Sequence, residues 1–445
     1  MSTRGQPGAR KEFTVKVIAF DDDPTGCQTV HSCPLILDWS TDAVAAAVHD
    51  PAPVTFFLTN TRAVSPDAAT TITRDACRAF ARVKDPDEAY VIVSRSDSTL
   101  RGHFPLETDI IREELGPFDA VFVIPFFAEG GRITVDGTHY VVTDGVRTAA
   151  HDTEFARDGV FGYSSSFMPA YIEEKTRGSV RAADVVRFTA IHPQPDLADQ
   201  LRALEGYRYC VVDAETQEQL NGFIAVLSGV ARTGKRFLFR SAAGLLTSLA
   251  AQGPQPVAGP ELHKLVPGGR PGLIVVGSHV AKTTRQLNIL IAENGTVGIE
   301  VDVENAAADH TGTYLDEITT RIAHAHRAGA TPVVYTSRTE RTFADHDERL
   351  SFGDAVSRFI CSAVANAPRT IGFVIAKGGI TSHNVLSIGL GMTVTTVVGQ
   401  ILPGCPVVIT PATNTFSEIP VVIFPGNVGG DDSLAVAYRV LNANT

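Results

Sequence analysis

Two loops in the first half of this sequence combine carboxylate, hydroxyl and guanidinium groups directly after apolar runs. The first is Asp21–Gly26 (DDDPTG), and the second, Ser94–His103 (SRSDSTLRGH), follows the run Tyr90–Val93. Arginine binds carboxylates through paired hydrogen bonds, while aspartate and serine bind hydroxyl groups. The second loop offers all of these groups together and therefore favours a polyhydroxylated anion as its ligand. The residues that carry this chemistry are Asp97, Ser98, Thr99 and Arg101.

Glycine-rich loops follow apolar runs in the second half as well. Gly277–Gln286 (GSHVAKTTRQ) follows Leu273–Val276, Lys377–Asn384 (KGGITSHN) follows Gly372–Ala376, and Pro425–Asp432 (PGNVGGDD) comes near the end. Glycine lets backbone N–H groups approach a phosphate closely, and a helix that begins there adds its positive end. Any one of these loops is equally well explained as a turn. Together and in this order, they favour the binding of an anion.

The apolar runs alternate with alanine-rich amphipathic segments, a pattern typical of a parallel sheet covered on both faces. The strands predicted in the first half are Val15–Phe20, Val54–Leu58, Tyr90–Val93, Ala120–Ile124, Tyr209–Val212 and Arg236–Phe239. The helices predicted between them include Thr41–His49, Ala68–Arg82 and Glu218–Thr233. The strands predicted in the second half are Leu273–Val276, Gly298–Val301, Pro332–Tyr335, Gly372–Ala376, Val407–Thr410 and Val421–Phe424. In such sheets ligands bind beyond the carboxyl ends of the strands.

A cluster of proline and glycine, Ala251–Gly272 (AQGPQPVAGPELHKLVPGGRPG), interrupts the alternation and predicts a linker. We expect a flexible tail over residues 1–12, an N-terminal domain over 13–252, a linker over 253–272 and a C-terminal domain over 273–445. A chain of 445 residues is too long for one ordinary core. The predicted fold class is therefore α/β with two domains, each a mainly parallel sheet covered by helices, and an active site in the interdomain cleft.

The composition excludes several classes of partner. The formal net charge of −11 argues against nucleic acid, since nucleic-acid binders usually carry the opposite sign. The first residues contain no apolar stretch of the kind a secretory signal needs, which argues against a membrane and favours the cytoplasm. The six cysteines are scattered without a C-x-x-C pair, so we expect small buried side chains in a reducing compartment.

Asp21-Asp22-Asp23-Pro24-Thr25 after an apolar strand also resembles the first motif of haloacid-dehalogenase-type phosphatases. In that superfamily the first aspartate is the phosphorylated nucleophile. A phosphatase that uses the Asp21/Asp23 cluster would hydrolyse its substrate without any nucleotide. A second alternative is a non-catalytic sensor of sugar acids, which would bind its ligand without turnover. Neither alternative needs the glycine loops of the second half.

The whole ordered set of motifs resembles the four-carbon acid sugar kinase family, and this resemblance covers nearly the whole chain. Asp22–Gly26 is similar to the family's D-D-x-T-G, and Asp97–Gly102 matches D-S-T-x-R-G residue for residue. Gly131-Arg132 with Thr134 and Gly137 is similar to G-R-x-T-x-x-G. The C-terminal motifs of the family are matched by Gly277, Ser278, Thr283 and Gln286, by Gly378, Gly379, Thr381 and Ser382, by Pro403, Gly404 and Pro406, and by Gly426, Asn427 and Gly429.

The sequence departs from the commonest family pattern at a few positions. Pro24 replaces a phenylalanine, Cys27 an alanine, His103 an asparagine, and Val280 the second serine of the serine loop. These changes surround the presumed sugar pocket and nucleotide loop. These changes therefore affect the identity of the acid, which the sequence leaves open. They affect the expected type of reaction less.

The resemblance implies an N-terminal domain that binds an acid sugar and a C-terminal domain that binds ATP. The expected activity is an ATP-dependent kinase that phosphorylates the terminal hydroxyl of a small four-carbon or branched sugar acid in carbohydrate catabolism. Asp22 and Asp23 are the expected catalytic residues. Substrate binding is expected from Thr25, Gly26, Asp97, Ser98, Thr99, Arg101, Gly102 and Arg132. Nucleotide binding is expected from Ser278, Gly378, Gly379, Ile380, Thr381, Gly426 and Gly429.

Three further expectations accompany this assignment. Mg²⁺ should bridge the phosphates of the nucleotide. Its protein ligands stay open, because Asp431 and Asp432 suit a metal and equally suit the acidic start of a helix. Lys377 is a candidate partner for a phosphate. A homodimer is the default expectation for the assembly.

Overall fold

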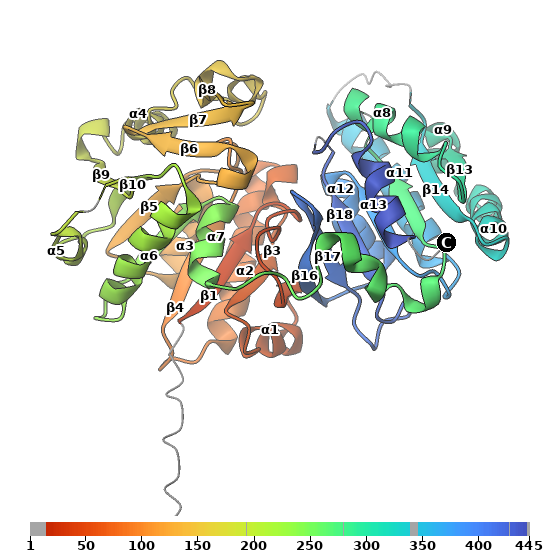
Figure 1. The fold of residues 1–445 in the computed structure, drawn as a ribbon, viewed down its shortest axis with the longest axis horizontal. Coiled ribbons are helices and arrows are strands. Elements are labelled where there is room, and N and C mark those ends of the chain that lie inside the picture. The colour runs from red at the N-terminus through yellow and green to blue at the C-terminus, as the bar shows by residue number, and fades with distance from the viewer. Residues whose placement is uncertain (1–14, 193, 279, 339–345, 427, 443–445) are drawn as a thin grey trace, which may run out of the picture.

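The structure, a computed structural model, describes residues 15–442 apart from residues 193, 279, 339–345 and 427. The predicted tail over residues 1–12 and Asn427 lie outside the described residues. Two α/β domains lie side by side (Figure 1), in agreement with the predicted fold class. None of the described helices has the length and apolar character needed to cross a membrane.

Within the described residues, the N-terminal domain supplies the first eleven strands and seven α-helices. Its strands are β1 (Lys16–Asp21), β2 (Cys33–Ile36), β3 (Val54–Leu58), β4 (Tyr90–Arg95), β5 (Ala120–Ile124), β6 (Arg132–Val135), β7 (Thr138–Thr143), β8 (Val146–Ala149), β9 (Val186–Thr189), β10 (Arg208–Asp213) and β11 (Phe237–Ser241). Its helices are α1 (Thr41–Val48), α2 (Pro66–Val83), α3 (Leu106–Leu115), α4 (Met168–Lys175), α5 (Leu197–Arg202), α6 (Gln217–Ala231) and α7 (Ala243–Ala250).

The C-terminal domain supplies the remaining elements. Its strands are β12 (Leu273–Val276), β13 (Thr296–Val301), β14 (Thr331–Thr336), β15 (Val374–Lys377), β16 (Val394–Leu402), β17 (Cys405–Ile409) and β18 (Pro420–Phe424). Its helices are α8 (Ala281–Leu290), α9 (Val303–Ala308), α10 (Thr313–Arg327), α11 (His346–Ala365), α12 (Gly379–Asn384) and α13 (Ser433–Leu441).

The two domains share one continuous sheet. In the described part of the chain its fifteen strands run in the order β13-β14-β12-β15-β18-β17-β16-β2-β3-β1-β4-β11-β5-β10-β9. Strands β2 and β16 pair in antiparallel fashion and join the parallel strands of the N-terminal domain to those of the C-terminal domain. The sequence did not reveal β2 or β16, so it did not reveal this junction. Joining the sheets pairs two edges that would otherwise expose unsatisfied backbone groups.

Strand β1 shows why the strands of this sheet read as continuous apolar runs. All six residues of Lys16–Asp21 are buried. Val17 and Ala19 face one core cluster, together with side chains of α6 and α7, whereas Ile18 and Phe20 face another, with side chains of α1 and α2. A parallel strand covered by helices on both faces has no solvent side, so it needs no polar alternation.

The caps of two helices can be traced to particular residues. The Ser65 side chain accepts a hydrogen bond from the backbone of Ala68, and Pro66 is the first residue of α2. Thr216 and Gln219 form a reciprocal capping box at the start of α6. Each arrangement satisfies backbone N–H groups that have no partner within the helix.

A segment that we call the insertion, residues 127–175, lies between β5 and β9 in the sequence. It contains the separate three-stranded sheet β6-β7-β8 and helix α4. In Figure 1 the small sheet lies above the main sheet of the N-terminal domain. Backbone bridges join Phe127 to Arg132 and Thr134 to Ala214, the residue that follows β10. The insertion therefore reaches the carboxyl ends of the parallel strands.

The predicted linker is packed against the C-terminal domain. The Gln255 side chain exchanges hydrogen bonds with the backbone of Gln400 in β16, and Leu262 is fully buried. The boundaries at 13–252, 253–272 and 273–445 stay a prediction.

Candidate active site

Three aspartates occupy the carboxyl end of β1, at the centre of the parallel strands. Strand β1 lies between β3 and β4, so the loops after these three strands meet at one edge of the sheet. Asp21 and Asp22 are buried, while the side chain of Asp23 keeps 19% of its surface exposed. Of the three carboxylates, Asp23 is therefore the one that solvent or a ligand can reach.

Arg95, the last residue of β4, compensates the buried pair. Its Nη1 lies 3.1 Å from Oδ1 of Asp21 and 3.9 Å from Oδ1 of Asp22. Burial raises the pKa of Asp21 to about 7, although Arg95 opposes the shift. Burial also raises the pKa of Asp22. Asp21 Oδ2 and Asp22 Oδ1 are buried without a hydrogen-bond partner among the described residues.

Arg62 joins three carboxylates from two loops. It follows β3, forms an ion pair with Asp23, and places Nη1 3.4 Å from Oδ1 of Asp97 and 4.0 Å from Oδ1 of Asp22. Burial would raise the pKa of Asp23, but Arg62 and Arg95 outweigh it and hold that pKa below its usual value. Asp23 is therefore an ionised carboxylate at neutral pH.

Arg62 was not among the residues that the sequence analysis selected. The loop after Val54–Leu58 contains neither glycine nor a carboxylate, whereas every loop indicated by the sequence pattern contains at least one glycine. Its position just beyond the carboxyl end of a predicted strand was the available signal. The neighbouring His103 supports this turn, because its Nε2 lies 3.1 Å from the carbonyl oxygens of both Thr61 and Val64.

Hydrogen bonds and close packing fix the position of Asp22. Ser96 Oγ lies 2.5 Å from Asp22 Oδ2 and 3.0 Å from the carbonyl oxygen of Arg101. Gly102 has a φ of +126°, and a Cβ there would lie 2.5 Å from Nη2 of Arg240 and 2.9 Å from Asp22 Oδ2. Only glycine combines that backbone conformation with such close packing.

Arg240 and Glu107 form a second buried ion pair behind this loop. Arg240 Nη1 also donates to Ser94 Oγ at 2.8 Å. Gly26 is packed just as tightly, since a Cβ there would lie 2.0 Å from Oδ2 of Asp21. The expected substrate residues Gly26 and Gly102 thus make room for charged side chains of the site.

The loop around Asp97 brings Arg101 close to Arg132, the first residue of β6 in the insertion. Burial opposes ionisation of Asp97, but Arg62 and Arg101 hold its pKa well below the usual range. Arg101 Nε donates to Asp97 at 2.8 Å, and Thr99 donates to the same carboxylate. The guanidinium carbons of Arg101 and Arg132 lie 5.1 and 5.9 Å from the ring centroid of Phe155.

Arg132 has few partners for a charged group. Burial, with Arg101 adding to the effect, lowers its pKa, and its Nε is buried without a hydrogen-bond partner among the described residues. Two guanidinium groups close to one aromatic ring suit an anion such as a carboxylate.

Three loops of the C-terminal domain converge after β12, β15 and β18. Thr283 Oγ1 lies 3.2 Å from Ser278 Oγ and donates to the carbonyl of Gly426 at 2.9 Å. A Cβ at Gly378, whose φ is +119°, would lie 3.3 Å from Cβ of Ser278, and one at Gly277 would lie 2.2 Å from Thr381 Oγ1. The glycines of these loops leave little side chain between the backbones, as a phosphate site requires, and we call the three loops the glycine cradle.

Lys377, the last residue of β15, binds the backbone of one loop of the cradle. The side chain is fully buried, and its Nζ donates to the carbonyl oxygens of Pro425 at 2.5 Å and Gly426 at 3.2 Å. Burial lowers the pKa of Lys377 to about 7. In the structure the ammonium group of Lys377 therefore binds backbone carbonyls of the loop. The sequence had led us to expect a phosphate as its partner.

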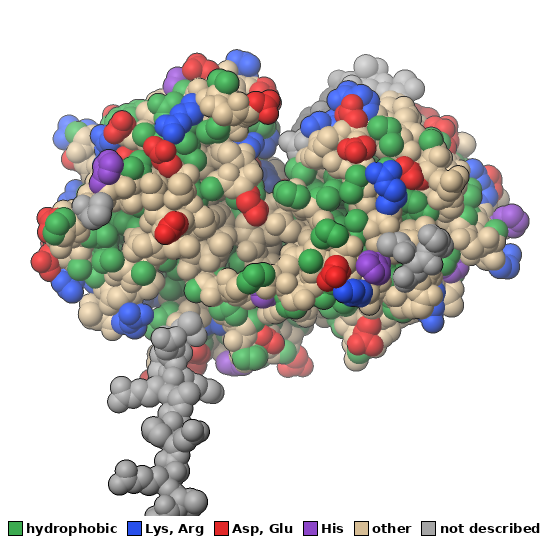
Figure 2. Space-filling model, in the orientation of Figure 1, with side chains coloured by type: hydrophobic (Ala, Val, Ile, Leu, Met, Phe, Trp, Pro, Cys, Tyr) green, Lys and Arg blue, Asp and Glu red, His purple; other side chains and the backbone are tan. Residues whose placement is uncertain are grey.

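The loop after β1 and the cradle approach each other across the domain boundary. A Cβ at Gly379 would lie 3.7 Å from Oδ2 of Asp23. A Cβ at Gly404 would lie 3.2 Å from Oε1 of Gln28. Figure 2 shows the notch between the two domains on the side of the small sheet.

A cavity of about 310 Å³ lies along the same boundary. It is lined by residues of the β1 loop and the insertion, such as Gln28 and Phe127, and by Gln255 and Gln400 of the linker and β16. Its lining therefore draws on both domains and on the linker between them.

The structure groups the expected site residues into two clusters that meet at Asp23 and Gly379. The first cluster contains Asp22, Asp23, Thr25, Gly26, Asp97, Thr99, Arg101 and Gly102, with Arg132 beside it and Ser98 in the same loop. The second contains Ser278, Gly378, Gly379, Thr381 and Gly426. Ile380 projects outward with 57% of its surface exposed, and Gly429 packs against Ser433 beside the cradle.

Among the described residues, no group of three or more histidine, cysteine, aspartate or glutamate side chains could hold a metal ion. Asp431 pairs with Arg285 at 3.0 Å. Magnesium in phosphate-transfer sites often uses only one or two carboxylates and takes its other ligands from phosphates and water. The carboxylates of the β1 loop fit that requirement, because Asp23 is ionised and accessible.

Comparisons with known proteins match both domains. Residues 17–249 match a family model described as a sugar-binding N-terminal domain, and residues 273–434 match one described as a nucleotide-binding C-terminal domain. A D-erythronate kinase from Heliobacterium modesticaldum is 29% identical over 252 residues, which cover 55% of this chain and 52% of that protein. The match therefore spans about half the length of this curated relative.

Two solved structures share the fold. A Salmonella typhimurium LT2 protein with the provisional name of a tRNA synthase has a TM-score of 0.67 and 18% identity, over 95% of this chain and 98% of that one. A Haemophilus influenzae protein from a domain family of unknown function has a TM-score of 0.60 and 19% identity, over 96% of this chain and 100% of that one. The shared architecture covers both domains.

Replacing Arg62 by glutamine should destabilise the protein by about 3 kcal/mol, because Asp22, Asp23 and Asp97 would lose a common cation in a largely buried site. The measurement is urea unfolding at neutral pH. Arg74→Gln is the matched control, since Arg74 pairs with Glu113 and Glu114 on the helix surface and should change stability by at most about 1 kcal/mol. Equal effects of the two substitutions would contradict the role given to Arg62.

Proposed function

The chain belongs to the four-carbon acid sugar kinase family, and from this premise we propose that it phosphorylates the terminal hydroxyl of a small sugar acid with ATP. The observation that carries the proposal is the approach of Asp23 to Gly379, where a Cβ would lie 3.7 Å from the carboxylate. A kinase must bring its acceptor hydroxyl to the γ-phosphate, and here the acidic loop meets the glycine cradle. A role in carbohydrate catabolism, a cytoplasmic location and a homodimer stay predictions from the sequence.

We assign the acceptor hydroxyl to Asp23. Phosphoryl transfer depends mainly on positioning and on stabilising charge, and one carboxylate commonly accepts the proton of the attacking hydroxyl. Asp23 is ionised, partly exposed and oriented by Arg62 and Thr25. Asp22 is buried and bonded to Ser96, so its role is to hold the loop in place.

The carboxylate of the acid binds Arg101 and Arg132 in this proposal. Both guanidinium groups lie close to Phe155, and Arg132 retains an unpartnered Nε among the described residues. Asp97 fixes the orientation of Arg101 through a 2.8 Å hydrogen bond. An acid held there by its carboxylate would direct its far hydroxyl toward Asp23.

The nucleotide binds the cradle of the C-terminal domain in this proposal. Backbone N–H groups near Ser278, Gly379 and Gly426 would contact the phosphates, and the start of α8 would add the positive end of a helix dipole. The exposed Ile380 offers an apolar contact at the rim. Mg²⁺ would bind together with the nucleotide and neutralise charge on its phosphates, with phosphate and water oxygens as its main ligands.

Two features speak against the rival functions. In a haloacid-dehalogenase-like phosphatase, Asp21 would attack phosphorus, but its carboxylate is fully buried beneath Gly26 and paired with Arg95. A sensor of sugar acids would have no use for a nucleotide-binding domain, which residues 273–434 match.

The test is a coupled assay of ADP release with Mg²⁺ and ATP against a panel of acids that includes D-erythronate, D-threonate, 3-oxo-tetronate and 3-oxo-isoapionate. We expect ADP release that depends on one of these acids. Phosphate release from sugar phosphates without nucleotide would instead support the phosphatase. Binding of an acid without turnover would support the sensor.

Asp23→Asn should lower kcat at least about 100-fold, because the amide cannot accept the proton of the hydroxyl. The KM for ATP should stay within a factor of about two, since the cradle belongs to the other domain. Steady-state kinetics at saturating acid measures both quantities. The control is Asp42→Asn on the exposed surface of α1, and near-normal turnover of Asp23→Asn would exclude Asp23 as the base.

Arg101→Met should raise the KM for the acid roughly 100-fold, because a charged bidentate partner of the carboxylate is lost. Binding of ATP should not change. The matched control is Arg112→Met on α3, where an arginine also lies over an aromatic ring, at 4.4 Å from the centroid of Tyr207. An unchanged KM for the acid in Arg101→Met would exclude the carboxylate role.

A further inference from the structure

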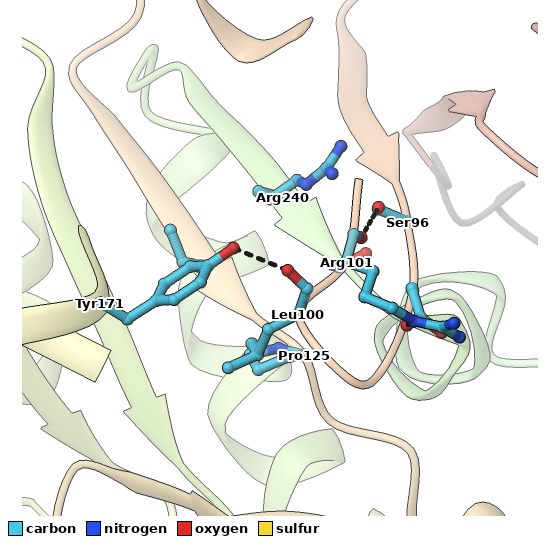
Figure 3. Close-up of a pocket in the computed structure, with 9 residues that line it drawn as sticks. Ser96, Leu100, Arg101, Pro125, Tyr171 and Arg240 are labelled. Carbon is cyan, nitrogen blue, oxygen red and sulfur yellow. Dashed lines mark hydrogen bonds and ion pairs between the residues drawn. The ribbon is translucent and has the colours of Figure 1, made fainter. Parts of the chain in front are cut away.

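Three successive carbonyl groups of the loop around Asp97 accept hydrogen bonds from side chains that lie outside the loop. His139 Nε2 lies 2.8 Å from the Ser98 oxygen, Tyr163 donates to Thr99 at 2.9 Å, and Tyr171 donates to Leu100 at 2.9 Å. Figure 3 shows the hydroxyl of Tyr171 pointing at the Leu100 carbonyl. All three donors belong to the insertion: His139 lies on β7, Tyr163 on the segment between β8 and α4, and Tyr171 on α4.

The contact of His139 determines which of its nitrogens carries the proton. The side chain is fully buried, and its Nδ1 lies 3.0 Å from the hydroxyl of Thr134. Since a carbonyl oxygen can only accept, the proton must be on Nε2, and the Thr134 hydroxyl donates to Nδ1. Burial lowers the pKa of His139 to about 4, so the ring is neutral at physiological pH.

The two tyrosines are held in place by their aromatic neighbours. Phe104 stacks on Tyr171 with ring centroids 5.8 Å apart, and Tyr163 meets Tyr171 edge to face at 5.7 Å. Both tyrosines are buried. Their hydroxyl groups therefore occupy fixed positions, and these positions restrain the carbonyl groups of Thr99 and Leu100.

The loop needs such external support because its own backbone is strained. Leu100 has a φ of +69°, a left-handed conformation that a leucine rarely adopts. Within residues 97–101, the internal backbone bond runs from the Leu100 N–H to the Asp97 oxygen and measures 3.3 Å. This strained turn separates Asp97 from Arg101, the two groups that line the presumed sugar site.

We propose that His139, Tyr163 and Tyr171 are positioning residues that act as a carbonyl clamp on residues 98–100. The clamp sets the distance and orientation between Asp97 and Arg101 by fixing the backbone of the loop that joins them. Its effect on the affinity for the acid rests on the proposed function. Its effect on the loop does not.

The experiment compares Tyr163→Phe, Tyr171→Phe and their double variant in the full chain. Each substitution removes a hydroxyl and leaves the ring in place. Tyr207→Phe is the matched control, since that hydroxyl also donates to a backbone carbonyl, Thr108 in α3, at 3.3 Å, but away from the loop. The first readout is hydrogen–deuterium exchange of the peptide that spans residues 97–104, and the second is steady-state kinetics.

In the double variant we expect amide exchange in residues 97–104 to rise about tenfold, together with a rise of about tenfold in the KM for the acid. The KM for ATP should stay within a factor of about two. Tyr207→Phe should behave like the unmodified protein in both readouts. Restoring either hydroxyl should recover part of both effects.

Unchanged loop exchange in the double variant would overturn the clamp, and so would an equal rise in Tyr207→Phe. A rise in exchange with an unchanged KM for the acid would also overturn it as a positioning device. If the unmodified protein turns over none of the acids, the proposed function fails, and the exchange measurement alone then decides whether the clamp holds the loop.

Discussion

The charge balance at the carboxyl end of β1 constrains the rest of the structure. Three consecutive aspartates cannot be buried together unless cations from other loops compensate them. Arg62 after β3 and Arg95 at the end of β4 supply this compensation, and the burial of Asp21 and Asp22 leaves only Asp23 accessible. The parallel order of β3, β1 and β4 is what brings these loops to one edge. The aspartate cluster therefore requires Arg62 and Arg95 for charge compensation, and it leaves the carboxylate of Asp23 accessible to a ligand.

The junction of the two domains is the second constraint. Strand β16 of the C-terminal domain pairs with β2, and the linker packs against β16, so the domains meet through backbone hydrogen bonds as well as through side chains. This pairing places the cradle beside the acidic loop, with Gly379 next to Asp23. The proposed phosphoryl transfer needs donor and acceptor in line at one point, and a shared sheet holds the two proposed binding sites beside each other.

The sequence predicted the parts of this arrangement that depend on local pattern. The α/β class and most strands follow from continuous apolar runs, and the boundaries of Val54–Leu58, Ala120–Ile124 and Leu273–Val276 agree with β3, β5 and β12. The sequence did not predict the short β2, the antiparallel β16 or the small sheet of the insertion, because tertiary contacts determine which strands pair. The role of Arg62 was not predicted for a related reason, since its ion pairs join it to carboxylates that are distant in the chain. The expected roles of the site residues stay predictions.

The most direct test of the account is a crystal structure with a non-hydrolysable ATP analogue and the acid that supports turnover. We expect the phosphate chain in the cradle at Ser278, Gly379 and Gly426, and the acid between Arg101 and Asp23. The terminal hydroxyl should lie about 3 Å from Asp23 and face the γ-phosphate. A nucleotide bound outside the cradle, or an acid whose hydroxyl is remote from Asp23, would contradict the shared site between the two domains.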